Sequence, residues 1–143
     1  MNSNGNSNDS HSIDLKGHTI LLVEDDGISS QVFEHFFRKT GATIISTTNG
    51  RQALDLLESG PATIDIIFMD IAMPVLGGTE TAEMIRSMDN YAHVPIIAWT
   101  ATSPQEILKI PGGVFDDYLI KPTEMQVIIE AAAKWIKVAI EQD

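Results

Sequence analysis

The sequence contains no cysteine, few basic residues and no long apolar run, and each absence narrows the range of functions. Without cysteine, disulfide frameworks, thiol catalysis, iron–sulfur clusters and zinc ribbons are all excluded. Only 9 lysines and arginines stand against 20 acidic residues, and the net charge of −11 disfavours a surface that binds nucleic acid. No run approaches the ~20 apolar residues of a membrane span, and no signal peptide is recognisable. We therefore expect a soluble, cytoplasmic protein that makes no membrane contact.

The length of 143 residues suits one ordinary domain preceded by a short tail. Residues 1–12 contain four Asn and four Ser. A segment of this composition buries too little apolar surface to offset the conformational entropy lost on ordering. We expect a flexible Asn/Ser-rich tail over residues 1–16 and a single domain over residues 17–143. A chain of this size buries roughly two-thirds of its unfolded surface, which is enough for a core without disulfides.

Short apolar runs alternate with amphipathic stretches from residue 17 onward. The runs are typical of buried parallel strands and cover residues 19–23, 42–46, 64–69, 94–99 and 115–120. Five strand–helix units in succession predict right-handed crossovers and helices on both faces of the sheet. The predicted fold class is α/β, with a doubly wound sheet of five parallel strands.

Caps and breakers delimit the helices between these strands. Asp26 is a predicted N-cap, and Thr123 with Gln126 forms a predicted capping box for the last helix. Residues 103–113 begin with Ser-Pro and contain Pro-Gly-Gly, so we expect a stunted helix there. In the first helix, a single apolar stripe is predicted from Ile28, Val32, Phe33, Phe36 and Phe37.

Polar side chains follow four of the five predicted strands. Ligands of open parallel sheets bind outside the carboxyl ends of the strands, so these side chains are candidates for one site. Two carboxylates ~4 Å apart repel by about 4 kcal/mol at an effective dielectric constant near 20, so a cluster of acids requires a counter-charge such as Mg²⁺. The candidates are Glu24, Asp25, Asp70, Thr100 and Lys121.

Four motifs at these positions, LLVEDD, MDIAMP, AWTA and YLIKP, resemble in order and spacing the receiver domain of two-component response regulators. The resemblance covers about residues 17–140. It implies a CheY-like, flavodoxin-like sheet with strand order 2-1-3-4-5 and a role in phosphorelay signal transduction. The motifs MDIAMP and DDYLIKP resemble slightly more closely the corresponding motifs in the receivers of hybrid sensor histidine kinases. A stand-alone response regulator and a receiver from a longer kinase both stay open.

By this resemblance, Asp70 is the phosphoacceptor. The phosphoryl group would come from a histidine of a partner, either a sensor histidine kinase or a histidine phosphotransfer domain. Asp25 and Asp70 would bind Mg²⁺ directly, the backbone carbonyl of Ala72 would be a third ligand, and Glu24 would act through water. The downstream protein partner is not identified by the sequence.

The resemblance also assigns roles to residues of the last two strands. Thr100 and Lys121 would contact the phosphoryl group, and the Lys121–Pro122 peptide bond would be cis. Thr100 and Tyr118 would form the conformational switch that alters a protein-interaction surface. Such a domain catalyses only its own phosphorylation and dephosphorylation, so we do not expect an enzyme in the ordinary sense.

The chain departs from the family pattern at two places. Gly77-Gly78 replaces the more usual acidic residue and single glycine, which we expect to loosen the loop after Asp70. Trp99 stands where an aliphatic residue is more usual, and strand alternation turns it away from the Thr100 hydroxyl into a packed face.

Two other functions are considered. One is a degenerate receiver-like module that binds without phosphorylation. The other is a phosphatase of the haloacid-dehalogenase type, which also forms an aspartyl phosphate with Mg²⁺. That class needs a second acid two residues after the nucleophile, where this chain has Ala72.

Overall fold

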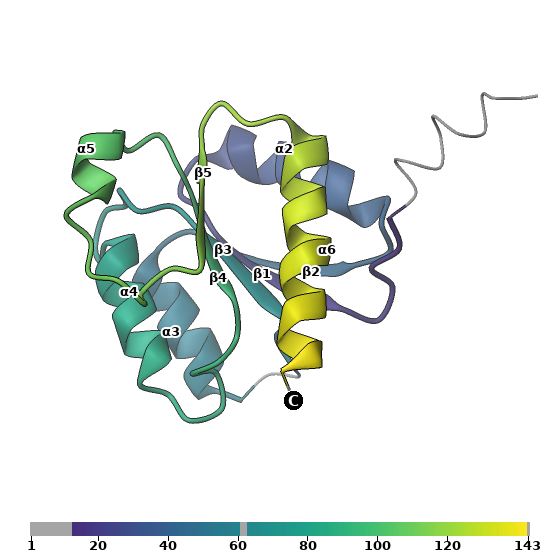
Figure 1. The fold of residues 1–143 in the computed structure, drawn as a ribbon, viewed down its shortest axis with the longest axis horizontal. Helices are drawn as coiled ribbons and strands as arrows, with labels where there is room; N and C mark the ends of the chain where they lie inside the picture. The colour runs from purple at the N-terminus through teal and green to yellow at the C-terminus, as the bar shows by residue number, and fades with distance from the viewer. Residues whose placement is uncertain (1–12, 61–62, 143) are drawn as a thin grey trace, which may run out of the picture.

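Five parallel strands form the central sheet of the structure, a computed structural model that describes residues 13–60 and 63–142. Their order is β2-β1-β3-β4-β5, so the predicted fold class and strand order are confirmed (Figure 1). Every described residue of β3 and β4 is buried, which explains their near-continuous apolar sequence. The strands are β1 (Thr19–Val23), β2 (Thr43–Thr47), β3 (Ile66–Met69), β4 (Ile96–Thr100) and β5 (Asp117–Ile120).

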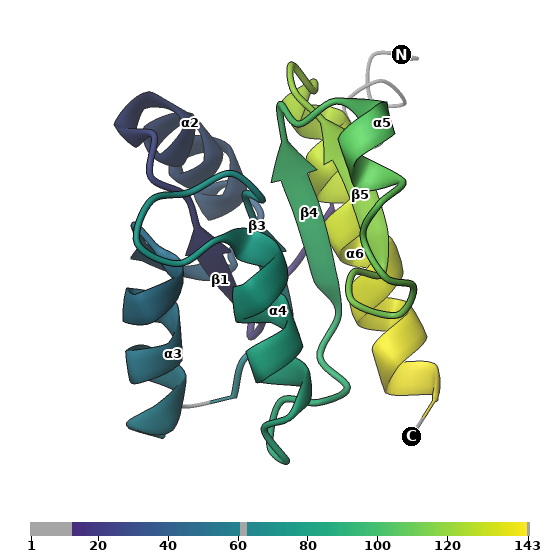
Figure 2. The ribbon, with the colours of Figure 1, turned by 90° about the vertical axis from the view of Figure 1, so that its left-hand side faces the viewer.

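Helices cover both faces of this sheet (Figure 2). Buried residues of α2 and α6 pack on one face, and those of α3 and α4 pack on the other. The helix α5 has only four residues, which confirms the predicted stunted helix. No helix within the described ranges is long and apolar enough to cross a membrane. The helices are α2 (Gly27–Arg38), α3 (Gly50–Glu58), α4 (Gly78–Arg86), α5 (Pro104–Ile107) and α6 (Met125–Glu141).

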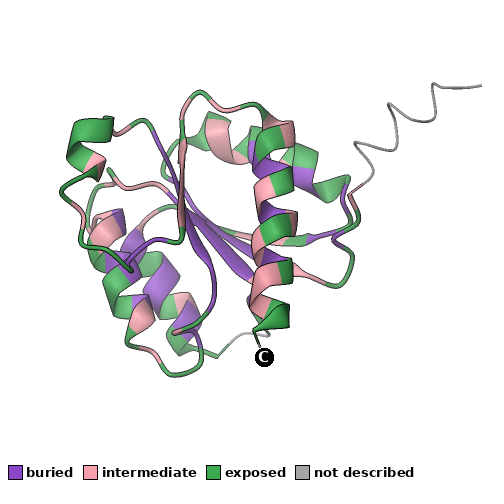
Figure 3. Ribbon diagram, in the orientation of Figure 1, coloured by how far each residue is buried: buried purple, intermediate pink, exposed green. Residues whose placement is uncertain are grey.

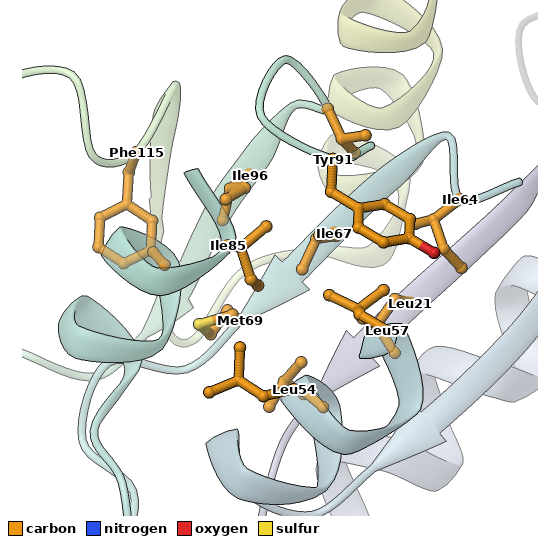
Figure 4. Packing of buried hydrophobic residues seen from close by; sticks show 14 of the residues in the cluster. Leu21, Leu54, Leu57, Ile64, Ile67, Met69, Ile85, Tyr91, Ile96 and Phe115 are labelled. Atoms are coloured by element: carbon orange, nitrogen blue, oxygen red, sulfur yellow. The ribbon is translucent and has the colours of Figure 1, made fainter. Parts of the chain in front are cut away.

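Strand alternation divides the apolar residues between two cores. Buried residues are concentrated in the central strands β1, β3 and β4 and on the inner sides of the helices (Figure 3). On the α3–α4 face, Leu54 and Leu57 of α3 and Ile85 of α4 pack against the sheet residues Leu21 and Ile67 (Figure 4). The core on the α2–α6 face is rich in aromatic rings and contains Phe33, Phe37, Phe68 and Trp99.

The helix α2 presents two apolar ridges rather than the predicted single stripe. Phe33 and Phe37 are fully buried, but Ile28 is 73% exposed, and Val32 and Phe36 are also exposed. Residues four apart lie on one side of a helix, so Ile28, Val32 and Phe36 form a second ridge beside the core-facing one. The single-stripe prediction was therefore wrong for these three residues.

The predicted boundaries hold to within a few residues, with two differences of note. Asp26 caps α2 as predicted, accepting from the backbone N–H of Ser29 at 3.3 Å. The N-cap of α6 is Glu124 rather than Thr123, whose hydroxyl donates to the carbonyl of Ile120 at 2.6 Å. The predicted N-cap of the last helix was thus one residue too early.

The folded part of the chain begins before residue 17. Leu15 is buried in the α2–α6 core, and its N–H donates to the carbonyl of Thr40 at 2.7 Å. An apolar side chain at residue 15 thus extends the domain into the predicted tail. Residues 1–12 of the predicted tail lie outside the described residues.

Candidate functional site

Three acidic side chains meet at the carboxyl ends of β1 and β3, as the sequence predicts. Val23 pairs with Met69, so Glu24 and Asp70 leave the two strands side by side. The N–H of Asp70 donates to the carbonyl of Val23 at 3.0 Å, which extends the ladder and fixes the position of Asp70. One carboxylate oxygen from each of Glu24, Asp25 and Asp70 lies within 4.8 Å of the other two.

Glu24 is the buried member of this cluster, with 1% of its surface exposed. Its Oε1 accepts from the Lys121 ammonium at 2.5 Å, and its Oε2 accepts from the N–H of Asp26 at 3.0 Å. Burial raises the pKa of Glu24, although the hydrogen bonds from Lys121 and from the Asp26 backbone act in the opposite direction. Both carboxylate oxygens of Glu24 are already engaged, and the exposed Asp25 is the most accessible of the three acids.

Lys121 brings the positive charge of the site from the end of β5. Its backbone N–H donates to the carbonyl of Thr100 at 2.8 Å, and the Lys121–Pro122 bond is cis, as the resemblance implies. The ammonium bound to Glu24 also lies 3.9 Å from Oδ2 of Asp70. A single cation therefore bridges the two carboxylates that end β1 and β3.

Thr100 contacts the other carboxylate oxygen of Asp70. Its fully buried hydroxyl donates to Oδ1 of Asp70 at 2.7 Å. The hydroxyl oxygen also lies 2.9 Å from Oγ1 of Thr102 and accepts from the N–H of Thr102 at 3.2 Å. A carboxylate only accepts, so the Thr100 proton points to Asp70 and the Thr102 hydroxyl donates to Thr100. Thr102 was not among the predicted site residues. The sequence feature that could have indicated it is a second hydroxyl side chain two residues after Thr100.

Tyr118 stands apart from this hydrogen-bonded group. It pairs with Ala98 in the sheet and packs against the α3–α4 core, with its ring 5.5 Å from that of Phe115. Burial raises the pKa of the Tyr118 phenol. Within the described residues, no hydrogen bond joins Tyr118 to Thr100, and their joint role as a switch stays a prediction.

The loop after Asp70 ends in a close backbone contact at Gly78, and its expected loosening by Gly77-Gly78 stays a prediction. Gly78 is buried, and its N–H donates to the carbonyl of Ile71 at 2.8 Å. A Cβ on Gly78 would overlap the carbonyl oxygen of Asp70, so only glycine fits beside this backbone. Val75 has φ of 73° in a turn closed by the N–H of Leu76 and the carbonyl of Pro74.

The cluster has the donor set that Mg²⁺ prefers. Three carboxylates face one ammonium, which leaves two negative charges without a counter-ion among these groups. Magnesium favours carboxylate and carbonyl oxygens and retains waters, and the exposed side chain of Asp25 gives such a hydrated ion access. The exposed residue Ala72 lies in the loop between Asp70 and α4, and its carbonyl is the predicted third ligand. The residues present therefore fit the predicted ion.

Comparisons with known proteins agree with this geometry. The sequence profile of the response regulator receiver domain matches residues 20–133. The chain is 35% identical over 120 residues to hybrid signal transduction histidine kinase A of Dictyostelium discoideum, covering 80% of this chain and 6% of the kinase. It is 31% identical over 120 residues to the polar-differentiation response regulator DivK of Brucella anthropi, covering 82% of this chain and 95% of DivK.

A solved receiver domain has the same architecture. It belongs to a sensor histidine kinase of Pseudomonas aeruginosa, and in that crystal structure a magnesium ion is coordinated in the active-site cleft. The two chains share 34% identity with a TM-score of 0.75, covering 85% of this chain and 98% of the other. On the profile match, these similarities and the shared fold, the chain belongs to the response regulator receiver domain family of two-component signalling.

Proposed function

We propose that this receiver accepts a phosphoryl group on Asp70 from a histidine of a partner protein, with Mg²⁺ as cofactor. One observation supports this most strongly: both oxygens of Asp70 face groups suited to phosphoryl transfer. The Thr100 hydroxyl lies 2.7 Å from Oδ1, and the Lys121 ammonium lies 3.9 Å from Oδ2. A neutral donor and a cation beside a carboxylate favour its ionised form, and the same two groups can stabilise charge on a phosphoryl group that this carboxylate attacks.

The proposed reaction forms a mixed anhydride on Asp70. A carboxylate oxygen attacks the phosphorus of phosphohistidine, the P–N bond breaks, and its electron pair leaves with the imidazole. Lys121 stabilises negative charge on the transferring group, and Thr100 donates to one of its oxygens. Asp25, Asp70 and the carbonyl of Ala72 would hold Mg²⁺, which would supply further positive charge to the transferring group.

The product of this reaction is a signal rather than a released metabolite. Once Asp70 carries the phosphoryl group, Thr100 has a new acceptor, and its movement would open space for Tyr118. The proposed domain, beginning near Leu15, catalyses only its own phosphorylation and dephosphorylation. Its surface then passes the change to a downstream protein.

An apolar groove beside Lys121 is proposed as the contact for the donor. The groove has a volume of about 440 Å³, and we call it the α2 groove; its apolar lining is made of Ile28, Val32, Trp99, Ala101, Pro122 and Met125. A partner histidine must reach Asp70, so the donor has to cover the surface next to Lys121. A donor with apolar side chains flanking its histidine fits this groove and the exposed ridge of α2.

Ile28→Ser is expected to slow transfer from a phosphorylated histidine phosphotransfer domain by about tenfold, because Ile28 is the most exposed part of the ridge. Labelling by acetyl phosphate, which needs no docking surface, should stay at the wild-type rate. Leu108→Ser is the matched control, since Leu108 is 84% exposed and lies outside the groove. Equal slowing with both donors would contradict a docking role.

The proposed function is tested by incubating the chain with acetyl phosphate and Mg²⁺ and measuring the intact mass. The wild type should gain the mass of one phosphoryl group, and Asp70→Asn should gain none. Asp25→Asn should lose labelling because an ion ligand is removed, and addition of EDTA to the wild type should do the same. Labelling that persists in Asp70→Asn, or a wild type that is never labelled, refutes the proposal.

A further inference from the structure

Trp99 lies directly beneath the cation of the site, and the proposed mechanism makes no use of it. The Lys121 ammonium is 4.6 Å from the centroid of the Trp99 ring. Trp99 is 5% exposed and belongs to the α2–α6 core, as strand alternation predicts. The side chain of Lys121 is 19% exposed, so the ammonium over this ring is largely shielded from water. Shielding of this kind strengthens the attraction between a cation and an aromatic face.

The indole N–H of Trp99 is energetically unfavourable at this position. Its Nε1 is buried and makes no hydrogen bond to any residue that the structure describes. An unpaired buried donor is unfavourable, and an aliphatic side chain in the same core would avoid the penalty. What an indole offers and an aliphatic side chain lacks is a π face, and Lys121 is the cation found over it.

The ring is held in place by other aromatic side chains. Its centroid is 5.5 Å from that of Phe33, which in turn stacks on Phe37 at 4.3 Å. Both phenylalanines are fully buried in α2. The ring is therefore a fixed surface. The lysine side chain above it has four rotatable bonds and many alternative rotamers.

We propose that Trp99 is a positioning residue for Lys121, an inference that rests on the proposed function. Three groups surround the ammonium: Glu24 Oε1 at 2.5 Å, Asp70 Oδ2 at 3.9 Å and the Trp99 ring at 4.6 Å. Glu24 alone leaves the ammonium free to swing about one hydrogen bond. The ring adds a second fixed contact for the ammonium, which then stays within reach of Asp70 before and during transfer.

The contact itself is tested without phosphorylation. The chain has two tryptophans, so Trp135→Phe leaves Trp99 as the sole indole reporter. In that background, Lys121→Met should change the Trp99 emission, and the Lys121 Hε resonances should be shifted upfield relative to those in Trp99→Leu. Unchanged emission, together with Hε shifts that do not depend on Trp99, overturns the proposal.

The consequence for the reaction is tested with acetyl phosphate. Trp99→Leu should slow phosphoryl incorporation by about fivefold, the rate equivalent of a typical cation–π contact. Trp99→Phe retains a π face and should recover part of the loss. In a Lys121→Met background, Trp99→Leu should have no further effect, whereas a purely structural role would slow both backgrounds equally and overturn the proposal. A wild type that takes no phosphoryl group refutes the proposed function, while the spectra still decide whether the contact exists.

Discussion

Lys121→Met should slow phosphoryl incorporation on Asp70 by about 100-fold or more, the usual cost of removing a group that stabilises transition-state charge. Methionine keeps most of the lysine volume, so the change removes mainly the cation that lies 3.9 Å from Asp70 Oδ2. The measurement is the rate of mass gain with acetyl phosphate at saturating Mg²⁺. Lys109→Met is the matched control, because Lys109 pairs with Glu106 on the exposed surface at 3.1 Å. A loss below tenfold would contradict the role given to Lys121.

The same substitution should also make stability depend more strongly on pH. Glu24 has a raised pKa in the folded chain, and removing Lys121 takes away two influences that lower it. A carboxyl with a raised folded pKa favours folding below its unfolded pKa, and this contribution is lost as pH rises through the folded value. Without added metal, the free energy of unfolding of Lys121→Met should therefore fall more steeply from acidic to neutral pH than in the wild type. Adding Glu24→Gln should abolish the difference.

Gly78→Ala should lower the free energy of unfolding by about 3 kcal/mol, at the upper end of overpacking costs. The added methyl would overlap the carbonyl oxygen of Asp70 and lie 2.7 Å from Cα of Ile71. Both contacts are with backbone, so relief requires β3 or α4 to move. Because Asp70 itself would shift, phosphoryl incorporation should fall together with stability, and urea denaturation with intact-mass labelling would measure both.

Gly77→Ala is the neighbouring control for Gly78→Ala. Its Cβ would meet Glu80 Oε1 at 2.8 Å, which is the end of a flexible side chain that can turn aside. Gly77 also has φ of −68°, which any residue can adopt. We expect Gly77→Ala to change the free energy of unfolding by less than about 0.5 kcal/mol. Equal losses at both glycines would show that loop flexibility, and not the close approach at Gly78, accounts for the effect.

The fold and the cluster of acids were predictable because they depend on patterns that the backbone enforces. Parallel strands place their carboxyl ends at one edge, so Glu24, Asp70 and Lys121 could be grouped from their positions alone. The N-cap at Asp26 was equally predictable, since its hydrogen bond is local.

Features that depend on packing between distant elements could not be predicted. Whether an apolar residue of α2 faces the core or solvent depends on how the helix is rotated on the sheet, so Ile28 and Phe33 looked alike in the sequence. The contact between Trp99 and Lys121 requires the pairing of β4 with β5 and one particular lysine rotamer. The burial of Leu15 depends on its packing in the α2–α6 core, which the local sequence does not reveal.

The bond from Thr100 to Asp70 has a consequence for the energetics of signalling. The hydroxyl and the backbone N–H of Thr102 both donate to the Thr100 oxygen. The single proton of the Thr100 hydroxyl is therefore donated to another group. In the resting chain that acceptor is Oδ1 of Asp70, and after transfer it would be a phosphoryl oxygen. The change is an exchange of one acceptor for another, with no donor left unsatisfied in either state. A downstream protein that binds one of the two conformations more tightly would then shift their populations by its differential affinity.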